Sequence, residues 1–141
     1  MHAPVRLSDF TLVLPQSSTR VPAGFPSPAQ DYPHDDLDLG ERLIRDRAAT
    51  YIWSASGNSL VGAGTFDGSL LLVDRGVDPV SGSIVIAIVD GEFTVKRLEL
   101  LAGGAPVLRA ANPDYPDLVL DELSELTIWG VVTWVISQPP L

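Results

Sequence analysis

Residues 84–98 read IVIAIVDGEFTVKRL, and this stretch carries the clearest local signal of structure in the chain. Two runs rich in β-branched and aromatic residues flank Asp90-Gly91, a dipeptide that favours the two-residue type I′ turn of a β-hairpin. The stretch therefore predicts an antiparallel hairpin with strands at 84–89 and 93–98.

Four more runs of the same character surround this hairpin in the sequence. They are rich in apolar and β-branched residues, most of them are too short for helices, and they cover 49–53, 70–73, 107–110 and 128–136. The chain also holds 12 Gly and 12 Pro, so turns are frequent. These patterns predict a mostly β fold of strongly bent antiparallel sheets.

The first part of the chain has a different composition. Six prolines fall between positions 4 and 33, at intervals that interrupt regular structure. We expect residues 1–36 to be an extended, flexible arm and residues 37–141 to be a β-rich domain. A short helix is expected within 37–47, with Asp38 as its N-cap and Glu41 as the capping-box partner.

Composition narrows the function classes. The net charge is −9, and no basic stripe offsets it, so direct binding to nucleic acid is not expected. The absence of Cys excludes disulfides, thiol catalysis and thiolate metal sites. The sequence shows neither a signal peptide nor a run of 18 apolar residues, which favours a soluble, cytoplasmic protein with no membrane association.

The segment Ser56-Gly57-Asn58-Ser59-Leu60 follows the expected strand 49–53. A glycine within a small polar cluster at a strand end suits a sharp turn that presents a hydroxyl, although such clusters are more often plain turns. A nucleophilic serine needs a base. His2 and His34 both lie in the arm, which argues against a Ser-His-Asp triad.

Lys96 is the one lysine among nine basic residues, and the other eight are Arg. Unlike arginine, lysine can lose its proton, and burial among apolar side chains lowers its pKa. Strand alternation places Thr94 on the same face, where its hydroxyl can accept a hydrogen bond from the Lys96 amine. The competing interpretation is a surface lysine on an edge strand.

Several segments, in order along the chain, resemble the LexA/UmuD family of self-cleaving Ser-Lys peptidases. Each segment is similar to one family motif: the cleavage region, the nucleophile loop, the strand after it, the hairpin with the base and the closing strand. In this sequence the segments are 24–29 (GFPSPA), 55–60 (ASGNSL), 67–74 (DGSLLLVD), 84–98 and 128–132 (IWGVV).

The resemblance implies the fold shared by LexA and bacterial signal peptidases, with no metal or cofactor. It also implies that Ser59 is the nucleophile, that Lys96 is the general base and that Ala23–Gly24 is the bond cut. Leu60 stands where Met is common, and Ala23 stands where some UmuD proteins have Cys. Both exchanges keep the size or polarity of the side chain, so the mechanism need not differ.

The resemblance further implies a role in the SOS response. In this family a RecA filament on single-stranded DNA promotes self-cleavage, and the shortened homodimer joins a UmuC-type polymerase for translesion synthesis. Only 23 residues precede the expected cut, which favours the UmuD-type subunits of translesion DNA polymerase V over LexA-type repressors. A LexA-like or signal-peptidase-like enzyme acting on another protein, and a non-catalytic β interaction module, stay open as alternatives.

Residues 128–136 also bear on assembly. Alternation makes both faces of this expected strand largely apolar. We expect a homodimer held partly by strand pairing near the C-terminus, and the alternative is a central strand that is covered on both sides within one chain.

Overall fold

The computed structural model describes residues 11–29, 33–121 and 123–141. The chain divides into two compact units, Met1–Arg47 and Ala48–Leu141. The sequence placed a boundary between residues 36 and 37, and that placement stays a prediction. The first ten residues of the expected arm, His2 among them, lie outside the described residues.

The first unit contains a small sheet that the sequence did not predict. Strand β1 (Val13–Ser17) pairs antiparallel with β2 (His34–Asp38), and Val13 lies opposite Asp38. Helix α1 (Leu39–Leu43) follows directly, and the Asp38 carboxylate accepts a hydrogen bond of 3.2 Å from the Glu41 backbone N–H. The expected N-cap is therefore confirmed. The helix is shorter than the window 37–47 because the backbone turns extended at Ile44.

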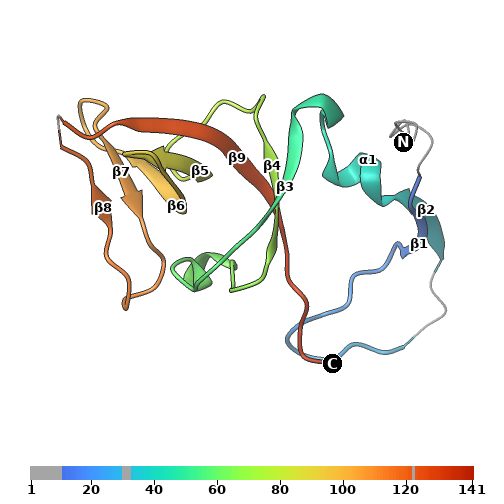
Figure 1. Cartoon of the computed structure of the whole chain (residues 1–141). Helices are drawn as coiled ribbons and strands as arrows, with labels where there is room; N and C mark the ends of the chain where they lie inside the picture. Colours follow the sequence, from blue (N-terminus) through green and yellow to red (C-terminus); the bar gives the residue numbers. More distant parts are fainter. Residues whose placement is uncertain (1–10, 30–32, 122) are drawn as a thin grey trace. The chain divides into compact units, whose positions relative to one another are not determined.

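The second unit is one antiparallel sheet of seven strands among the described residues, in the order β3-β4-β9-β5-β6-β7-β8 (Figure 1). The mostly β prediction is confirmed. Short 3-10 turns, Arg47–Ala49 and Val61–Ala63, flank the first strand. The strands are β3 (Thr50–Ser54), β4 (Leu70–Asp74), β5 (Ile84–Val89), β6 (Glu92–Leu100), β7 (Pro106–Arg109), β8 (Leu118–Val119) and β9 (Leu126–Ile136).

The Asp90-Gly91 hairpin forms as expected. Both turn residues have positive φ, 49° for Asp90 and 84° for Gly91, which is the signature of a type I′ turn. Val89 lies opposite Glu92, so the loop has two residues. This register places Lys96 opposite Val85, one pair from the end of the β5–β6 ladder that lies away from the turn.

The sheet is bent, and its buried apolar residues form two separate core clusters. Alternate residues of β5 point to opposite faces of the sheet. Val85 and Ala87 pack in one cluster, and Ile86 packs in the second cluster. The pairing register shifts between Leu72 and Val73 and again between Ile86 and Ala87, and such irregularities bend a strand.

The bend brings the first strand of the sheet against the fifth. The ring centroids of Trp53 on β3 and Phe93 on β6 are 5.0 Å apart, although three strands separate β3 from β6 in the sheet order. A flat sheet would hold these strands about 19 Å apart, because neighbouring strands are spaced by about 4.8 Å. The curled sheet therefore has an inner face, and the candidate site lies on it.

Candidate active site

Residues 56–60 form a turn after the end of β3, and the buried side chain of Leu60 anchors this turn to the core. Leu60 is 1% exposed, and its carbonyl accepts hydrogen bonds from the Ala63 and Thr65 N–H groups. Gly57 has φ of 85°, a conformation that favours glycine. The turn is thus fixed to the core at one end, and its polar residues stay at the surface.

Asn58 and Asp67 tie this turn to the next loop. The Asp67 carboxylate accepts from the Gly57 N–H at 2.8 Å, and the Asn58 side-chain oxygen accepts from the Asp67 N–H at 3.0 Å. Sequence reasoning missed this pair, because a reciprocal contact between two loops leaves no periodic signal.

Lys96 reaches Ser59 from the other side of the curled sheet. Its Nζ lies 2.8 Å from Ser59 Oγ, and the two residues are 37 positions apart in the chain. At Lys96, β6 pairs with β5, and its pairing with β7 begins one residue later at Arg97, but the Lys96 side chain is partly buried and turned towards Ser59. The competing interpretation of a solvent-facing edge lysine therefore does not describe its position.

Burial lowers the pKa of Lys96 from the ordinary lysine value, because desolvation disfavours the charged ammonium. A neutral amine at hydrogen-bonding distance from a hydroxyl is able to accept the hydroxyl proton. Either the amine or the hydroxyl can donate the hydrogen bond across this 2.8 Å contact, so the contact suits proton transfer from Ser59 Oγ to Lys96 Nζ.

Ser59 and Lys96 open into one cavity of about 230 Å³. Thr94 lines the same cavity; within the described residues, the Lys96 side-chain hydrogen bond goes to Ser59 and not to Thr94. The remaining wall is mainly apolar and aromatic, from Trp53, Ser54, Ala55, Ser56, Leu71, Ile86, Phe93 and Val95. Such a cavity suits a small or apolar side chain of a peptide.

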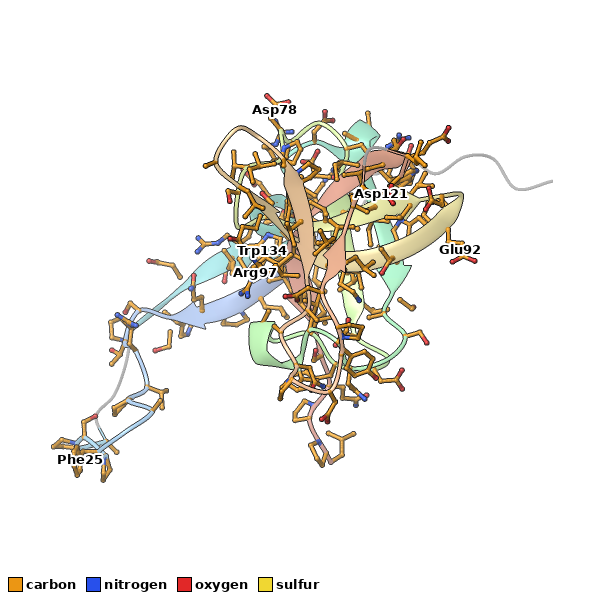
Figure 2. All side chains as sticks on the ribbon, turned by 90° about the vertical axis from the view of Figure 1, so that its left-hand side faces the viewer. Phe25, Asp78, Glu92, Arg97, Asp121 and Trp134 are labelled. Atoms are coloured by element: carbon orange, nitrogen blue, oxygen red, sulfur yellow. The ribbon has the colours of Figure 1, made fainter. Side chains whose placement is uncertain are left out.

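Ala23 and Gly24 lie in an exposed bend of the first unit. A Cβ added to Gly24 would meet nothing within 4 Å. The neighbouring Phe25 is 92% exposed, and Figure 2 shows its side chain at the tip of this segment. An accessible bend of small residues has the features of a peptide substrate.

Two features are absent from the described residues. They contain no group of three or more His, Asp or Glu side chains placed to hold a metal ion. None of their helices is long and apolar enough to cross a membrane.

Comparison with known proteins shows which family this chain matches and which relatives it is similar to. Residues 15–133 match the family described as Peptidase S24-like. Protein SamA of Salmonella typhimurium strain LT2 is 49% identical over 124 residues, which cover 88% of this chain and 85% of SamA. Protein ImpA of Shigella flexneri is 45% identical, covering 97% and 93%, and Protein MucA of Escherichia coli is 43% identical, covering 86% and 83%.

Proposed function

The chain belongs to the Peptidase S24-like family of serine peptidases, and we propose that it cuts itself once, between Ala23 and Gly24. Ser59 is the nucleophile in this proposal and Lys96 the general base. The observation that supports it most directly is the 2.8 Å contact between Lys96 Nζ and Ser59 Oγ inside a cavity that lowers the lysine pKa.

The proposed reaction uses no metal or cofactor. Neutral Lys96 takes the Ser59 hydroxyl proton as Oγ attacks the Ala23 carbonyl carbon. The tetrahedral oxyanion collapses, the Ala23–Gly24 bond breaks, and protonated Lys96 gives its proton to the Gly24 amine. Lys96 then deprotonates a water molecule that attacks the Ala23 ester carbon, and it returns this proton to Ser59 Oγ as the ester bond breaks.

The side chains around the Ala23–Gly24 bond suit the cavity beside Ser59 in size and in apolar character. Ala23 and Gly24 add little bulk beside the reacting carbonyl, which a narrow cleft next to Ser59 requires. Val21 is 90% exposed and Phe25 92% exposed, so apolar side chains on both sides of the bond are available to bury against an aromatic wall. Burial of that apolar surface would favour the cutting-competent pose.

The cellular role follows from the UmuD-like character of the chain. We propose that a RecA filament on single-stranded DNA stimulates the cut in the cytoplasm during the SOS response. The shortened chain, as a homodimer, then acts as the regulatory subunit of a UmuC-type translesion DNA polymerase. Direct binding of nucleic acid by the chain itself is not part of this proposal, since its net charge is −9.

A mass spectrum of the purified protein tests the proposal. Incubated at about pH 10, or near neutral pH with activated RecA filament, the chain should give fragments of 23 and 118 residues. Ser59→Ala and Lys96→Ala should each abolish the cut and keep the wild-type circular dichroism spectrum.

Three results would contradict it: a wild-type chain that stays intact under both conditions, a cut at another bond, or a cut in Ser59→Ala protein. An intact chain that still cleaves an added protein would point to the signal-peptidase-like alternative instead.

A further inference from the structure

The loop of residues 110–117, here called the clamp loop, holds the backbone on both sides of Ser59. The Ala111 N–H donates to the Ser59 carbonyl at 2.7 Å. The Asn112 side-chain Nδ2 donates to the Asn58 carbonyl at 2.8 Å. The Ala111 carbonyl accepts from the Gly62 N–H at 2.8 Å, so the contact continues past the turn.

The Asn112 contact bears on the peptide unit that joins Asn58 to Ser59. A trans peptide is planar, and its C=O and N–H point in opposite directions. The described residues contain no cis peptide bond, and among them the Ser59 N–H has no acceptor. The Asn58 carbonyl also accepts from the Val61 N–H, at the longer distance of 3.4 Å. The shorter contact with Asn112 therefore does most to set the direction of the Ser59 N–H on the other side of the peptide plane.

From this geometry we propose that Asn112 is a positioning residue for self-cleavage, whose side-chain amide holds the Asn58 carbonyl so that the Ser59 N–H points at the developing oxyanion. The inference rests on the proposed function. A fixed N–H donor stabilises charge that appears only in the transition state, and no reorganisation is needed at that moment. Asn112 does not touch the substrate, so it acts through the Ser59 backbone.

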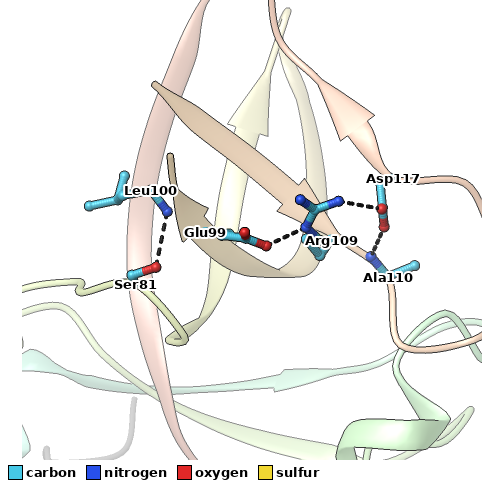
Figure 3. Close-up of polar contacts among 6 residues, drawn as sticks. All are labelled: Ser81, Glu99, Leu100, Arg109, Ala110 and Asp117. Carbon is cyan, nitrogen blue, oxygen red and sulfur yellow. Dashed lines mark hydrogen bonds and ion pairs between the residues drawn. The ribbon is translucent and has the colours of Figure 1, made fainter. Parts of the chain in front are cut away.

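The clamp loop is itself anchored at its base (Figure 3). The Asp117 carboxylate accepts from the Ala110 N–H and from Arg109 Nη1, each at 2.9 Å, and Arg109 Nε also pairs with Glu99 on β6. The hydrogen bonds from Arg109 lower the pKa of both carboxylates, because they stabilise the charged forms. The loop is thus closed onto the same strand, β6, that carries Lys96.

Asn112 has a second contact that allows a sharp test. Its Oδ1 accepts from the Asp114 N–H at 3.0 Å, which shapes the loop, whereas its Nδ2 holds the Asn58 carbonyl. Asn112→Asp keeps the acceptor and removes the donor. Gln138→Glu in the exposed C-terminal segment is the matched control, because it makes the same amide-to-carboxylate change and adds the same charge.

The measurement is the first-order rate of self-cleavage of the full chain from about pH 7 to pH 10. Asn112→Asp should lower the rate about tenfold to hundredfold at every pH, with the midpoint of the pH profile unchanged. Acylation of Ser59 by a small fluorophosphonate should fall in parallel, and the melting temperature should stay near that of Gln138→Glu. If Asn112→Asp fails to fold, Asn112→Ser, which keeps an acceptor but is too short to reach Asn58, is measured instead.

Two results would overturn the inference. One is an Asn112→Asp rate equal to that of Gln138→Glu. The other is a loss that vanishes at high pH through a raised midpoint, since this would mean that the new charge acts on Lys96. Failure of the proposed function would give a different result. In that case the wild-type chain itself would show no self-cleavage, and neither variant would differ from it in rate.

Discussion

Lys96 has the two properties that the proposed base requires. It is partly buried in the cavity, which lowers its pKa, and its amine contacts the Ser59 hydroxyl that it would deprotonate in the proposed mechanism. Arginine in the same place would keep the contact but not the chemistry, because a guanidinium does not lose its proton in proteins.

The pH dependence of self-cleavage follows from this lowered pKa. In the proposed mechanism the competent form is neutral Lys96, and its fraction increases as the pH rises through the pKa of Lys96 in the folded protein. Without any partner, the rate should therefore rise with pH and level off, with a midpoint below the ordinary lysine value of 10.5. Timed gel electrophoresis from about pH 7 to pH 10 measures the profile. A flat profile would exclude a titrating Lys96, and Lys96→Arg, the control, should stay uncut at every pH.

Gly62 shows a steric limit at the residue scale. A Cβ on Gly62 would lie 2.6 Å from the Ala111 carbonyl oxygen, a backbone atom that has no easy way to move. Gly62→Ala should lower the free energy of unfolding by about 1–3 kcal/mol and slow self-cleavage, because the clamp loop is pushed from Ser59. Thermal denaturation and the cleavage rate measure both effects. Gly40→Ala, whose Cβ would meet only an oxygen at 3.5 Å, should not destabilise the protein, and equal effects in the two variants would contradict the steric reason.

At the scale of single elements, the β5–β6 hairpin is specified locally. Asp90 and Gly91 make the turn, and Asp90 also bonds to the chain just before β9: its N–H donates to the Glu125 carbonyl and its carboxylate accepts from the Glu125 N–H, both at 3.0 Å. The turn thus sets the register that places Lys96 and holds the start of the central strand.

Gly91→Ala tests the backbone conformation of this turn. Gly91 has φ of 84°, and an added Cβ would meet nothing within 4 Å, so any cost comes from the conformation alone. We expect a loss of about 1–2 kcal/mol in the free energy of unfolding by urea denaturation. Glu92→Ala is the control, since the Glu92 side chain points outward at the end of the hairpin (Figure 2). A Gly91→Ala protein as stable as the wild type would exclude a strained turn.

At the scale of the whole molecule, the proposed substrate and the proposed catalytic groups come from different parts of the chain. The bend at Ala23 and Gly24 is in the first unit, whereas Ser59 and Lys96 are in the second. The proposed reaction requires the bend to lie in the cavity beside Ser59, and in our proposal a RecA filament acts by favouring this docked pose, without supplying catalytic groups. Each tenfold rise in the docked fraction corresponds to about 1.4 kcal/mol of differential binding.

Gly24→Asp separates docking from chemistry. The exposed bend has room for the new side chain, so the uncut protein should be unperturbed. Next to Ser59 a bulky charged side chain would crowd the scissile bond, and we expect no cut even with RecA filament. Ser59 should keep its reactivity towards a fluorophosphonate probe. A Gly24→Asp protein that is cut as fast as the wild type would mean that Ala23–Gly24 is not the site.

The expected homodimer belongs to the same scale. The first half of β9 pairs with β5 and the second half with β4, so each half keeps one edge unpaired by the described strands. Trp134 and Ile136 are 40% and 44% exposed near the end of β9. We expect a sedimentation mass of two 15.1 kDa chains at micromolar concentration. Trp134→Glu should shift it towards one chain, Thr127→Glu in the other half of β9 should not, and a wild-type monomer would contradict the expectation.

The sequence by itself determined the local elements and the candidate residues of this protein. Alternating β-branched runs, the Asp90-Gly91 turn and the Asp38 cap depend on neighbours in the chain, so they can be recognised from the sequence. Ser59 and Lys96 became candidates mainly through the ordered motifs that resemble the LexA/UmuD family, since the turn and the single lysine alone favour a plain turn and a surface lysine. The pairing of β1 with β2 was missed, because its partners are separated by a long proline-containing loop.

Only the tertiary structure decided how these elements meet. The curl of the sheet places Lys96 Nζ 2.8 Å from Ser59 Oγ across 37 residues of chain, and it brings Trp53 against Phe93. It also brings Asn112 to the carbonyl of Asn58, a contact that no spacing in the sequence indicates. The physical reason is that sheet curvature arises from twist, register shifts and packing summed over seven strands, so contacts across the curl depend on all of them together.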